Sequence, residues 1–317
     1  MPIAPQETLA RKSQALAQAL GAEIAAALAA PDVVEVWVNA DGAIWIERSG
    51  QGRRRSDVTM PPADAERVLR LVADHAGQVV THDHPLIGAA LPSGERFQGV
   101  YSPVSEAPSF VIRKRPAVIF TLEDYVGQGV MSPGQAGALE TAAAARVNIL
   151  IAGGTGTGKT TLANALLALP AYAQDRVILI EDTPELQCSA LDQLSLLSRR
   201  MEPVVTLADL VRTALRLRPD RIVIGEVRDG GALDLLKAWN TGHPGGLATL
   251  HANSAAEALA RLEDLIGEVS QQIPRRAIGQ AIGLIAFLRR APGGRVLDSL
   301  VRVEGWDPTE GYRLNLV

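Results

Sequence analysis

Residues 153–160 read Gly-Gly-Thr-Gly-Thr-Gly-Lys-Thr, and this octapeptide decides the fold of the second half of the chain. The apolar run Val147–Ala152 before it predicts a strand, and Lys159–Leu169 predicts a helix that Pro170 stops. Glycines at such a turn let backbone N–H groups curl around an anion, while the helix N-terminus adds the positive end of its dipole. The spacing therefore predicts a phosphate-binding loop.

The side chains of this loop suit a nucleoside triphosphate. Lys159 supplies a mobile positive charge for the β- and γ-phosphates, and the hydroxyl of Thr160 completes the shell of a Mg²⁺ ion. We therefore expect ATP and Mg²⁺ as cofactors, because the strand–loop–helix context disfavours a glycine-rich turn without nucleotide. The candidate nucleotide-binding residues here are Gly153, Gly154, Thr155, Gly156, Thr157, Gly158, Lys159, Thr160 and Thr161.

Two further predicted strands end in carboxylates. The apolar run Ile222–Gly225 leads into Glu226, and Arg176–Ile180 leads into Glu181 and Glu185. Ligands of parallel sheets sit at the carboxyl ends of the strands, so Glu226 is expected to hold the attacking water or to bind Mg²⁺ directly or through water. Glu181 and Glu185 are expected to support the metal; the alternative is that one of them caps a turn or pairs with an arginine.

A histidine follows a fourth short apolar strand. His251 comes directly after Leu247–Leu250, which places it at the same predicted edge as Glu226. An imidazole there can sense the γ-phosphate or relay that contact, and the alternative is a purely structural histidine. His243, in the glycine-rich turn at 241–246, is open to both readings.

Strands alternate with helices from residue 134 onward, which predicts an α/β fold with a mostly parallel sheet covered on both faces. In the tail, strands expected to be antiparallel edges are Ile285–Leu288, Arg295–Val303 and Tyr312–Leu316. In residues 1–115 the expected elements follow the order helix, hairpin, helix and strands, which predicts a smaller α+β domain. The expected organisation is therefore 1–115 as this domain, 116–133 as a linker and 134–317 as the α/β domain.

Composition excludes several classes of protein. The 317 residues are 47% hydrophobic and 21% charged, with a net charge of −4, and neither half is basic, so nucleic acid is disfavoured as the main partner. The single Cys188 excludes an internal disulfide framework and a four-cysteine zinc module. No signal-peptide pattern or stretch of about 20 apolar residues is seen, so a cytoplasmic protein is expected. Arg53, Arg54 and Arg55 are expected in a solvated loop, with peripheral membrane contact as the alternative.

Four blocks of the sequence together resemble the secretion traffic ATPases. These blocks, in the order and spacing of that family, are the loop at 153–160, Glu-Asp-Thr-Pro-Glu-Leu at 181–186, Arg-Pro-Asp-Arg-Ile-Val-Ile-Gly-Glu-Val-Arg at 218–228, and Thr-Gly-His-Pro-Gly-Gly through Thr-Leu-His-Ala-Asn-Ser at 241–254. The chain looks most like the conjugal-transfer ATPases of the TrbB group in type IV secretion. With one cysteine it departs from the type II branch, which usually carries a four-cysteine module.

The resemblance implies a RecA-like P-loop ATPase domain and a sensor-like N-terminal domain in a homo-oligomer, expected to be a hexameric ring. Inner-membrane components of a type IV secretion or conjugation machine are the implied partners. Arg96 and Arg113 would then reach phosphate from the N-terminal domain, with ordinary exposed arginines as the alternative. Arg228 would contact nucleotide, stabilise Glu226 or touch a neighbouring subunit.

The resulting expectation is an Mg²⁺-dependent ATPase that powers conjugative type IV secretion. Two related alternatives are a Tad-type or other type IV pilus assembly ATPase and a nucleotide-gated scaffold with incidental hydrolysis. A helicase-like translocase shares the phosphate loop, but it predicts strong, salt-dependent DNA binding, which the mild acidity of both halves disfavours.

Overall fold

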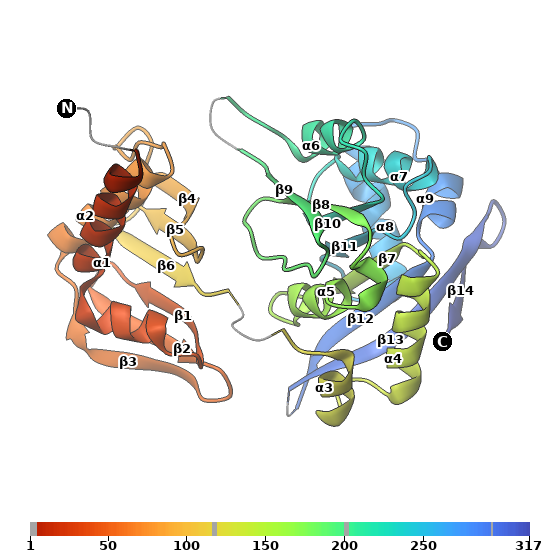
Figure 1. Cartoon of the computed structure of the whole chain (residues 1–317), viewed down its shortest axis with the longest axis horizontal. Coiled ribbons are helices and arrows are strands. Elements are labelled where there is room, and N and C mark those ends of the chain that lie inside the picture. Colours follow the sequence, from red (N-terminus) through yellow and green to blue (C-terminus); the bar gives the residue numbers. More distant parts are fainter. Residues whose placement is uncertain (1–4, 116–118, 200–202, 293) are drawn as a thin grey trace. The chain divides into compact units, whose positions relative to one another are not determined.

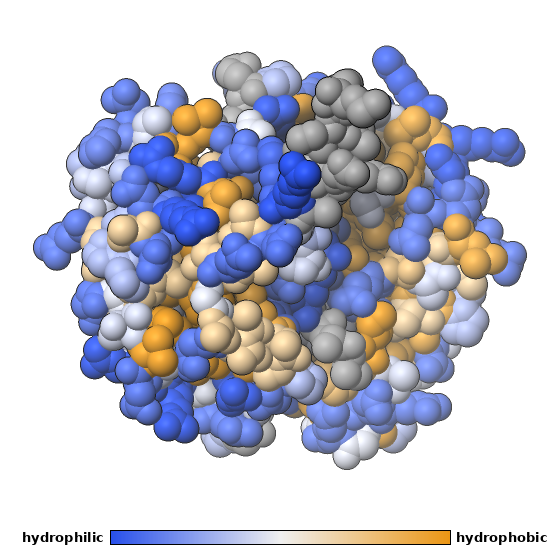
Figure 2. All heavy atoms as spheres, turned by 60° about the vertical axis from the view of Figure 1, so that its left-hand side comes forward, coloured by the Kyte–Doolittle hydropathy of each residue, from blue (hydrophilic) through white to orange (hydrophobic). Residues whose placement is uncertain are grey.

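The computed structural model describes residues 5–115, 119–199, 203–292 and 294–317 (Figure 1). The chain divides into two compact units, Met1–Ala117 and Val118–Val317. Each unit has its own hydrophobic core. The surface view shows mostly hydrophilic side chains, with hydrophobic ones in small scattered groups (Figure 2).

The first unit is a six-stranded antiparallel sheet with two helices on one face, in the order β3-β2-β1-β6-β5-β4. Val36 and Val38 alternate with more exposed neighbours, and they meet Leu20 and Ile24 of the first helix in the core. The elements are α1 (Pro5–Ala29), β1 (Val33–Val38), β2 (Ala43–Arg48), β3 (Gly52–Thr59), α2 (Pro62–His75), β4 (Leu86–Ala90), β5 (Arg96–Val100) and β6 (Ser109–Arg113).

The arginine triplet was expected in a loop, and that expectation is wrong. Arg53, Arg54 and Arg55 lie in β3, the edge strand of the first sheet, where all three side chains are exposed. Arg53 pairs with Glu47 and Arg55 with Trp45 across the hairpin. Positive side chains on an exposed edge strand discourage pairing with another chain, which accounts for a strand of such polar sequence.

The second unit contains an eight-stranded mixed sheet in the order β14-β13-β12-β7-β11-β10-β8-β9. Six neighbouring strands, from β12 to β9, are parallel, as the alternating pattern predicts. The strands are β7 (Ile149–Gly153), β8 (Arg176–Glu181), β9 (Asp192–Leu197), β10 (Arg221–Val227), β11 (Leu247–Leu250), β12 (Leu284–Ala291), β13 (Gly294–Asp307) and β14 (Gly311–Leu316).

The expected antiparallel edge strand is confirmed for β14; β13 is antiparallel to both of its neighbours but lies between them, and the prediction of an edge is wrong for β12. That strand, which contains the predicted Ile285–Leu288, runs parallel to β7 inside the sheet. Two helices precede it in the chain, and a helical crossover is the connection that parallel strands need. The exposed edge strand β9 was not predicted, because its sequence, Asp192–Leu197, is too polar to stand out as a buried strand.

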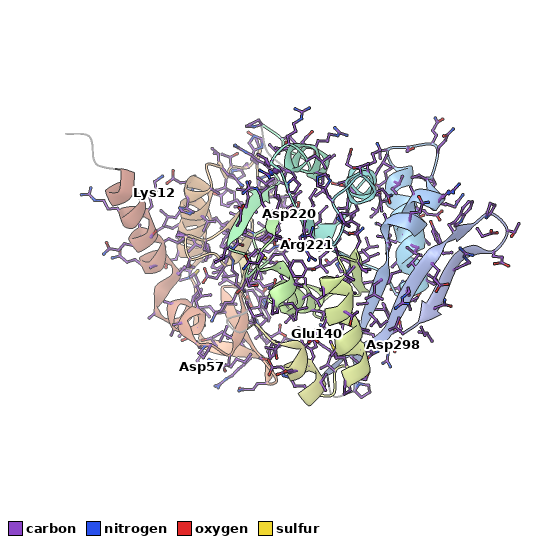
Figure 3. All side chains as sticks on the ribbon, turned by 45° about the vertical axis from the view of Figure 1, so that its right-hand side comes forward. Lys12, Asp57, Glu140, Asp220, Arg221 and Asp298 are labelled. Carbon is purple, nitrogen blue, oxygen red and sulfur yellow. The ribbon has the colours of Figure 1, made fainter. Side chains whose placement is uncertain are left out.

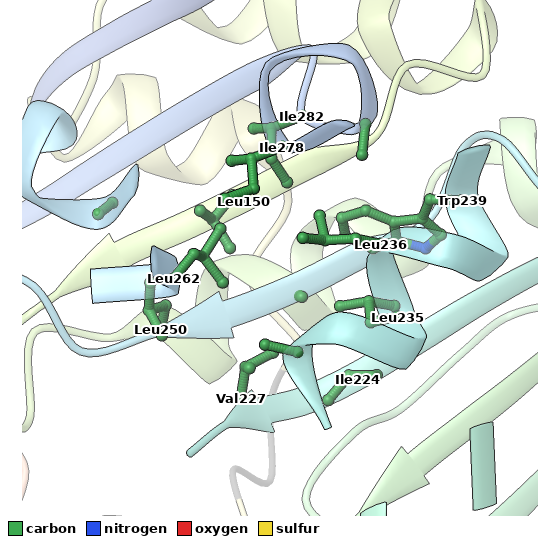
Figure 4. Packing of buried hydrophobic residues seen from close by; sticks show 14 of the residues in the cluster. Leu150, Ile224, Val227, Leu235, Leu236, Trp239, Leu250, Leu262, Ile278 and Ile282 are labelled. Carbon is green, nitrogen blue, oxygen red and sulfur yellow. The ribbon is translucent and has the colours of Figure 1, made fainter. Parts of the chain in front are cut away.

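Helices cover both faces of this sheet. One face packs against α6 (Leu207–Ala214), α7 (Ala232–Asn240), α8 (Ala255–Gly267) and α9 (Arg275–Ala281). Part of this core is seen in Figure 4, where Leu235 and Leu236 of α7 approach Leu150 and Ile224 of the sheet. The other face packs against α3 (Leu122–Gly127), α4 (Pro133–Ala144) and α5 (Lys159–Leu167).

The stretch expected to be a linker is partly built into the second unit. Leu122, Tyr125 and Met131 are buried against α4 and α5. Residues 116–118 lie outside the described part of the chain. The domain boundaries at 115 and 134 remain a prediction.

A buried arginine ties several elements together at the amino ends of the strands. Arg221 begins β10 and is 1% exposed (Figure 3). Its Nε donates to Asp175 Oδ2 at 2.6 Å, and its remaining nitrogens donate to the carbonyls of Ala143, Ala171 and Gly245. These bonds satisfy the buried guanidinium group at the end of the sheet opposite the phosphate loop, so removing Asp175 would leave an uncompensated buried charge.

Candidate functional site

The carboxyl ends of four neighbouring strands meet at one edge of the second sheet. In spatial order these strands are β7, β11, β10 and β8. The phosphate loop follows β7, His251 follows β11, Glu226 lies in β10, and Glu181 ends β8. The expectation that these residues share a sheet edge therefore follows from the strand order itself.

Tight backbone packing explains the glycines of the loop. A Cβ atom on Gly153 would lie 2.4 Å from the carbonyl oxygen of Leu288 in β12, and Gly158 has a φ of 94° where α5 begins. No side chain of the described residues caps the start of α5 at Gly158, and a helix N-terminus of this kind directs its N–H groups toward an anion. The hydroxyl of Thr157 donates to Gly154 O at 2.9 Å and braces the loop from within.

Lys159 is folded back onto the loop that carries it. Its side chain is buried, and Nζ donates to Gly153 O at 3.0 Å and to Gly154 O at 3.1 Å. Thr160 and Thr161 follow in the first turn of α5, and both are half-buried. The loop thus concentrates one ammonium group, two hydroxyls and the helix N-terminus, an arrangement that attracts a polyphosphate.

A β-bulge determines where Glu226 points. Along the β10–β11 pair, Ile224 lies opposite Ala248, and the next pair is Val227 with Leu250. Two residues of β10, Gly225 and Glu226, therefore stand opposite a single residue of β11. Bulges change the direction of side chains beside active sites, and they are rare between parallel strands.

Lys159, His251 and Glu226 come from three different elements and form one cluster. His251 Nδ1 lies 3.5 Å from Lys159 Nζ, and its Nε2 lies 2.9 Å from Glu226 Oε1. Burial lowers the pKa of His251 and the positive charge of Lys159 lowers it further, while Glu226 acts in the opposite direction. An ammonium can only donate, so a neutral imidazole accepts at Nδ1 and carries its proton on Nε2, facing Glu226.

Arg228 holds the other oxygen of Glu226. Its Nη2 donates to Glu226 Oε2 at 2.5 Å, and Nη1 lies 3.4 Å from Asp182 Oδ2. This hydrogen bond to Glu226 raises the pKa of Arg228. Glu226 Oε1 is buried, and although His251 Nε2 lies 2.9 Å away, the two groups are not aligned as a hydrogen bond. The carboxylate is thus held by Arg228 through Oε2, while Oε1 lies against the ring of His251.

A cleft of about 260 Å³ opens beside this carboxylate. Glu226, Arg228 and Asp182 line it from the strand ends, and Ser198 and Thr206 line it from the other side. Ser198 also donates to Asp182 Oδ1 at 2.5 Å, which fixes the wall of the cleft to the end of β9. Glu226 therefore lies on the wall of a cleft that solvent and small ligands can enter.

Glu181 shapes the loop that follows β8. Its Oε1 accepts from the backbone N–H groups of Glu185 and Leu186, each at 2.8 Å, and the residue is 5% exposed. The sequence left open that Glu181 or Glu185 caps a turn, and Glu181 does so through Oε1. Glu185 is half-buried, and its carbonyl accepts from Asn164 of α5.

His243 lies away from the cluster. The glycine-rich turn at 241–246 precedes β11, so it sits at the amino end of a strand whose carboxyl end leads to His251. Gly246 is required there because a Cβ atom would lie 2.0 Å from the indole nitrogen of Trp239. Of the two histidines, the structure brings only His251 to Lys159 and Glu226.

Arg96 and Arg113 belong to the first unit. They face each other across the β5–β6 pair, and Glu35 of β1 is the cross-strand partner of Arg113. Burial raises the pKa of Glu35, while the two arginines act to lower it. Glu47 of β2 lies opposite Glu35 in the same cross-strand row and also raises its pKa, so the two guanidinium groups share this row with two carboxylates.

Sequence reasoning missed two arginines beside the phosphate loop. A Cβ atom on Gly156 would lie 2.4 Å from Nη2 of Arg290, and one on Gly158 would lie 3.1 Å from Nη1 of Arg295. Both come from the β12–β13 hairpin and reach the loop because β12 pairs with β7. No sequence motif contains these two arginines. Only the parallel pairing of β12 with β7 would have revealed them, and the sequence pattern did not predict that pairing.

A divalent ion would find oxygen donors here. The described residues contain no group of three or more His, Cys, Asp or Glu side chains arranged to hold a metal by themselves. Mg²⁺ usually binds through one or two protein oxygens together with phosphate and water, so the hydroxyl of Thr160 and the neighbouring carboxylates fit this ion.

Among the described residues, no helix is long and apolar enough to cross a membrane.

The chain is similar to known secretion proteins. The profile of the family described as "Type II/IV secretion system protein" matches residues 18–289. The conjugal transfer protein TrbB of Rhizobium radiobacter is 44% identical over 94% of this chain and 91% of its own length. A probable conjugal transfer protein TrbB of Sinorhizobium fredii is 46% identical over 93% of this chain and 90% of its own.

Solved structures support the fold. The pilus retraction motor PilT with bound ADP aligns with a TM-score of 0.60 at 21% identity, over 90% of this chain and 79% of that one. The ATPase DotB of Legionella pneumophila aligns with a TM-score of 0.58 at 18% identity, over 98% of this chain and 84% of that one. At such identities the likeness concerns the fold alone.

Proposed function

Because the chain belongs to the type II/IV secretion system protein family and is a conjugative type IV secretion ATPase, we propose that its second unit is a RecA-like P-loop domain that hydrolyses ATP at the edge formed by β7, β11, β10 and β8. The observation that carries this proposal is the cluster of Lys159, His251 and Glu226, three groups from three elements within 2.9–3.5 Å contacts.

Lys159 neutralises phosphate charge. In the structure its ammonium donates to the two carbonyls at 153 and 154, which a polyphosphate would replace with negatively charged oxygens. The backbone N–H groups of the loop and of the first turn of α5 complete the cradle. His251, through Nδ1, follows the position of Lys159 and so senses whether the γ-phosphate is present.

Glu226 orients the attacking water. Its side chain lines the cleft at the strand ends, and Oε1 makes no aligned hydrogen bond with His251 although Nε2 lies 2.9 Å away, so the carboxylate is suited to accept a proton from a water that enters the cleft. Arg228 fixes the carboxylate through Oε2. We assign Arg228 to this role in preference to direct nucleotide contact.

Mg²⁺ fits beside Thr160, with Glu226 or Glu181 bound through water; when bound, it neutralises charge on the β- and γ-phosphates. Glu181 supports this arrangement by holding the turn that carries Glu185. Removal of divalent ions with a chelator is expected to abolish turnover, and added Mg²⁺ is expected to restore it.

The substitution Glu226→Gln tests the catalytic assignment. It keeps the size of the side chain and removes the base, so turnover should fall by about 10²- to 10⁴-fold while binding of a non-hydrolysable ATP analogue is retained. Glu140→Gln, an exposed carboxylate on α4 labelled in Figure 3, is the matched control and should keep full activity. Wild-type turnover in Glu226→Gln would remove Glu226 from the mechanism.

We further propose a homo-oligomeric ring, expected to be a hexamer, at the cytoplasmic face of the inner membrane beside the membrane components of a conjugation machine. Arg96 and Arg113 are proposed to contribute positive charge to the bound phosphates; their direct pairing across β5 and β6, which places two guanidinium groups side by side, supports this. Light scattering with and without an ATP analogue tests the ring. Conjugation supported by Glu226→Gln in cells would instead favour the nucleotide-gated scaffold.

A further inference from the structure

We propose that Thr249 is a positioning residue for Glu226, which it aims by closing the β-bulge of β10. This inference rests on the proposed function of Glu226, and it assigns a role to the buried hydroxyl of Thr249, whose hydrogen bond goes to the backbone of β10. Three independent observations lead to it: the alternation of faces along β10, the hydrogen bond that spans the bulge, and the space around Gly225.

The alternation of faces shows what the bulge changes. Ile222 and Ile224 point into the core beneath α6–α9, and Val223 points into the core beneath α3–α5. Strict alternation would place Glu226 with Ile222 and Ile224, inside an apolar core. Instead Val227 takes that face, as Figure 4 shows for its side chain beside that of Leu235. Because of the extra residue, Glu226 stays out of the apolar core beneath α6–α9, and its side chain lies beside His251, next to Lys159.

Thr249 is the residue of β11 that stands opposite the bulge. Its hydroxyl donates to the carbonyl oxygen of Gly225 at 2.6 Å, and the residue is 1% exposed. An extra residue disrupts the regular ladder of hydrogen bonds. The hydroxyl of Thr249 supplies a bond at this point, so it fixes the peptide plane that immediately precedes Glu226.

The space around Gly225 restricts the bulge from the other side. A Cβ atom at this position would lie 3.0 Å from Cγ and 3.3 Å from Oε1 of Glu181. Glu181 is itself fixed by the two backbone N–H groups that it binds. The bulge is thus enclosed by Glu181 on β8 and by Thr249 on β11, and Glu226 inherits its direction from both neighbours.

The experiment compares one variant that lacks the hydroxyl of Thr249 with one that keeps it. Thr249→Val keeps the shape and removes the donor, whereas Thr249→Ser keeps the donor and removes a methyl group. We expect Thr249→Val to lower kcat about 10- to 100-fold, since a displacement of about 1 Å costs that much, with KM for ATP changed less than about threefold. Thr249→Ser should retain kcat within about threefold of the wild type.

A control and a second pair make the test independent of folding. Thr213→Val removes an exposed hydroxyl-to-carbonyl bond of 2.7 Å within α6 and should leave turnover unchanged. If Thr249→Val fails to fold, Thr249→Ala is compared with Thr249→Ser, because both lack the methyl group and only the latter keeps the donor. Thermal unfolding and analogue binding confirm that each variant is folded.

The outcomes separate this inference from the proposed function. Equal kcat losses in Thr249→Val and Thr249→Ser, or no loss in Thr249→Val while Glu226→Gln is inactive, would overturn the positioning role alone. Wild-type turnover in Glu226→Gln would overturn the proposed function first. A loss in Thr249→Val that appears only in KM would also contradict the proposal, because a misdirected Glu226 affects the chemical step and not binding.

Discussion

The buried pair of Arg221 and Asp175 gives a prediction about stability that the structure makes quantitative. The change is Asp175→Ala, which leaves the guanidinium of Arg221 in place. Arg221 is 1% exposed, donates to three backbone carbonyls and stacks on Tyr172 at 4.3 Å. These neutral partners satisfy its hydrogen bonds, but they do not compensate its charge.

The expected magnitude follows from burial. Removing one partner of a buried ion pair costs about 3–5 kcal/mol, because the remaining charge is uncompensated. For a unit of 150–250 residues, each kcal/mol lowers the melting temperature by about 2–4 °C, so Asp175→Ala should lower it by roughly 6–20 °C. Asp175 also accepts a hydrogen bond from Arg146, and losing this more exposed contact adds little.

The assay is thermal unfolding of the full chain, followed by circular dichroism. The control is Asp192→Ala, which removes the exposed ion pair between Asp192 and Arg176. The Asp192 side chain is 59% exposed, whereas the pair of Arg221 and Asp175 is buried. The control should shift the melting temperature by no more than a few degrees. Equal shifts in the two variants would refute the reasoning. The double change Asp175→Leu with Arg221→Met should be less destabilising than Asp175→Ala alone.

Three further predictions concern the site. The pKa of His251 is lowered from its ordinary value of 6.5, so the folded chain binds this proton more weakly than the unfolded chain, and the free energy of unfolding should fall as the pH drops below 6.5. The acid limb of the kcat/KM profile should therefore lie below pH 6.5, and it should be absent in His251→Gln. Asp182→Ala should lower kcat about three- to tenfold with unchanged KM, because Arg228 loses its second carboxylate; a change confined to KM would contradict this. Arg290→Ala should weaken ADP binding severalfold at low salt and less at high salt, measured by titration calorimetry; a salt-independent loss would argue against a charge effect.

The sequence determined the chemistry and the approximate architecture. The loop at 153–160 needs a strand before it and a helix after it, so its position along the chain already predicted β7 and α5. Apolar runs ending in Glu226 and His251 predicted strand ends at one edge, because parallel strands share their orientation. These are local properties, since they depend on residues that are neighbours in the chain.

Only the tertiary structure decided which of these residues meet and how they point. The parallel pairing of β12 with β7 brings Arg290 to the phosphate loop from more than a hundred residues away, and no local pattern encodes that pairing. Likewise, alternation along β10 would have buried Glu226 among apolar side chains. The bulge opposite Thr249 turns it outward, and a bulge arises from the register between two strands, which a single strand's sequence does not specify.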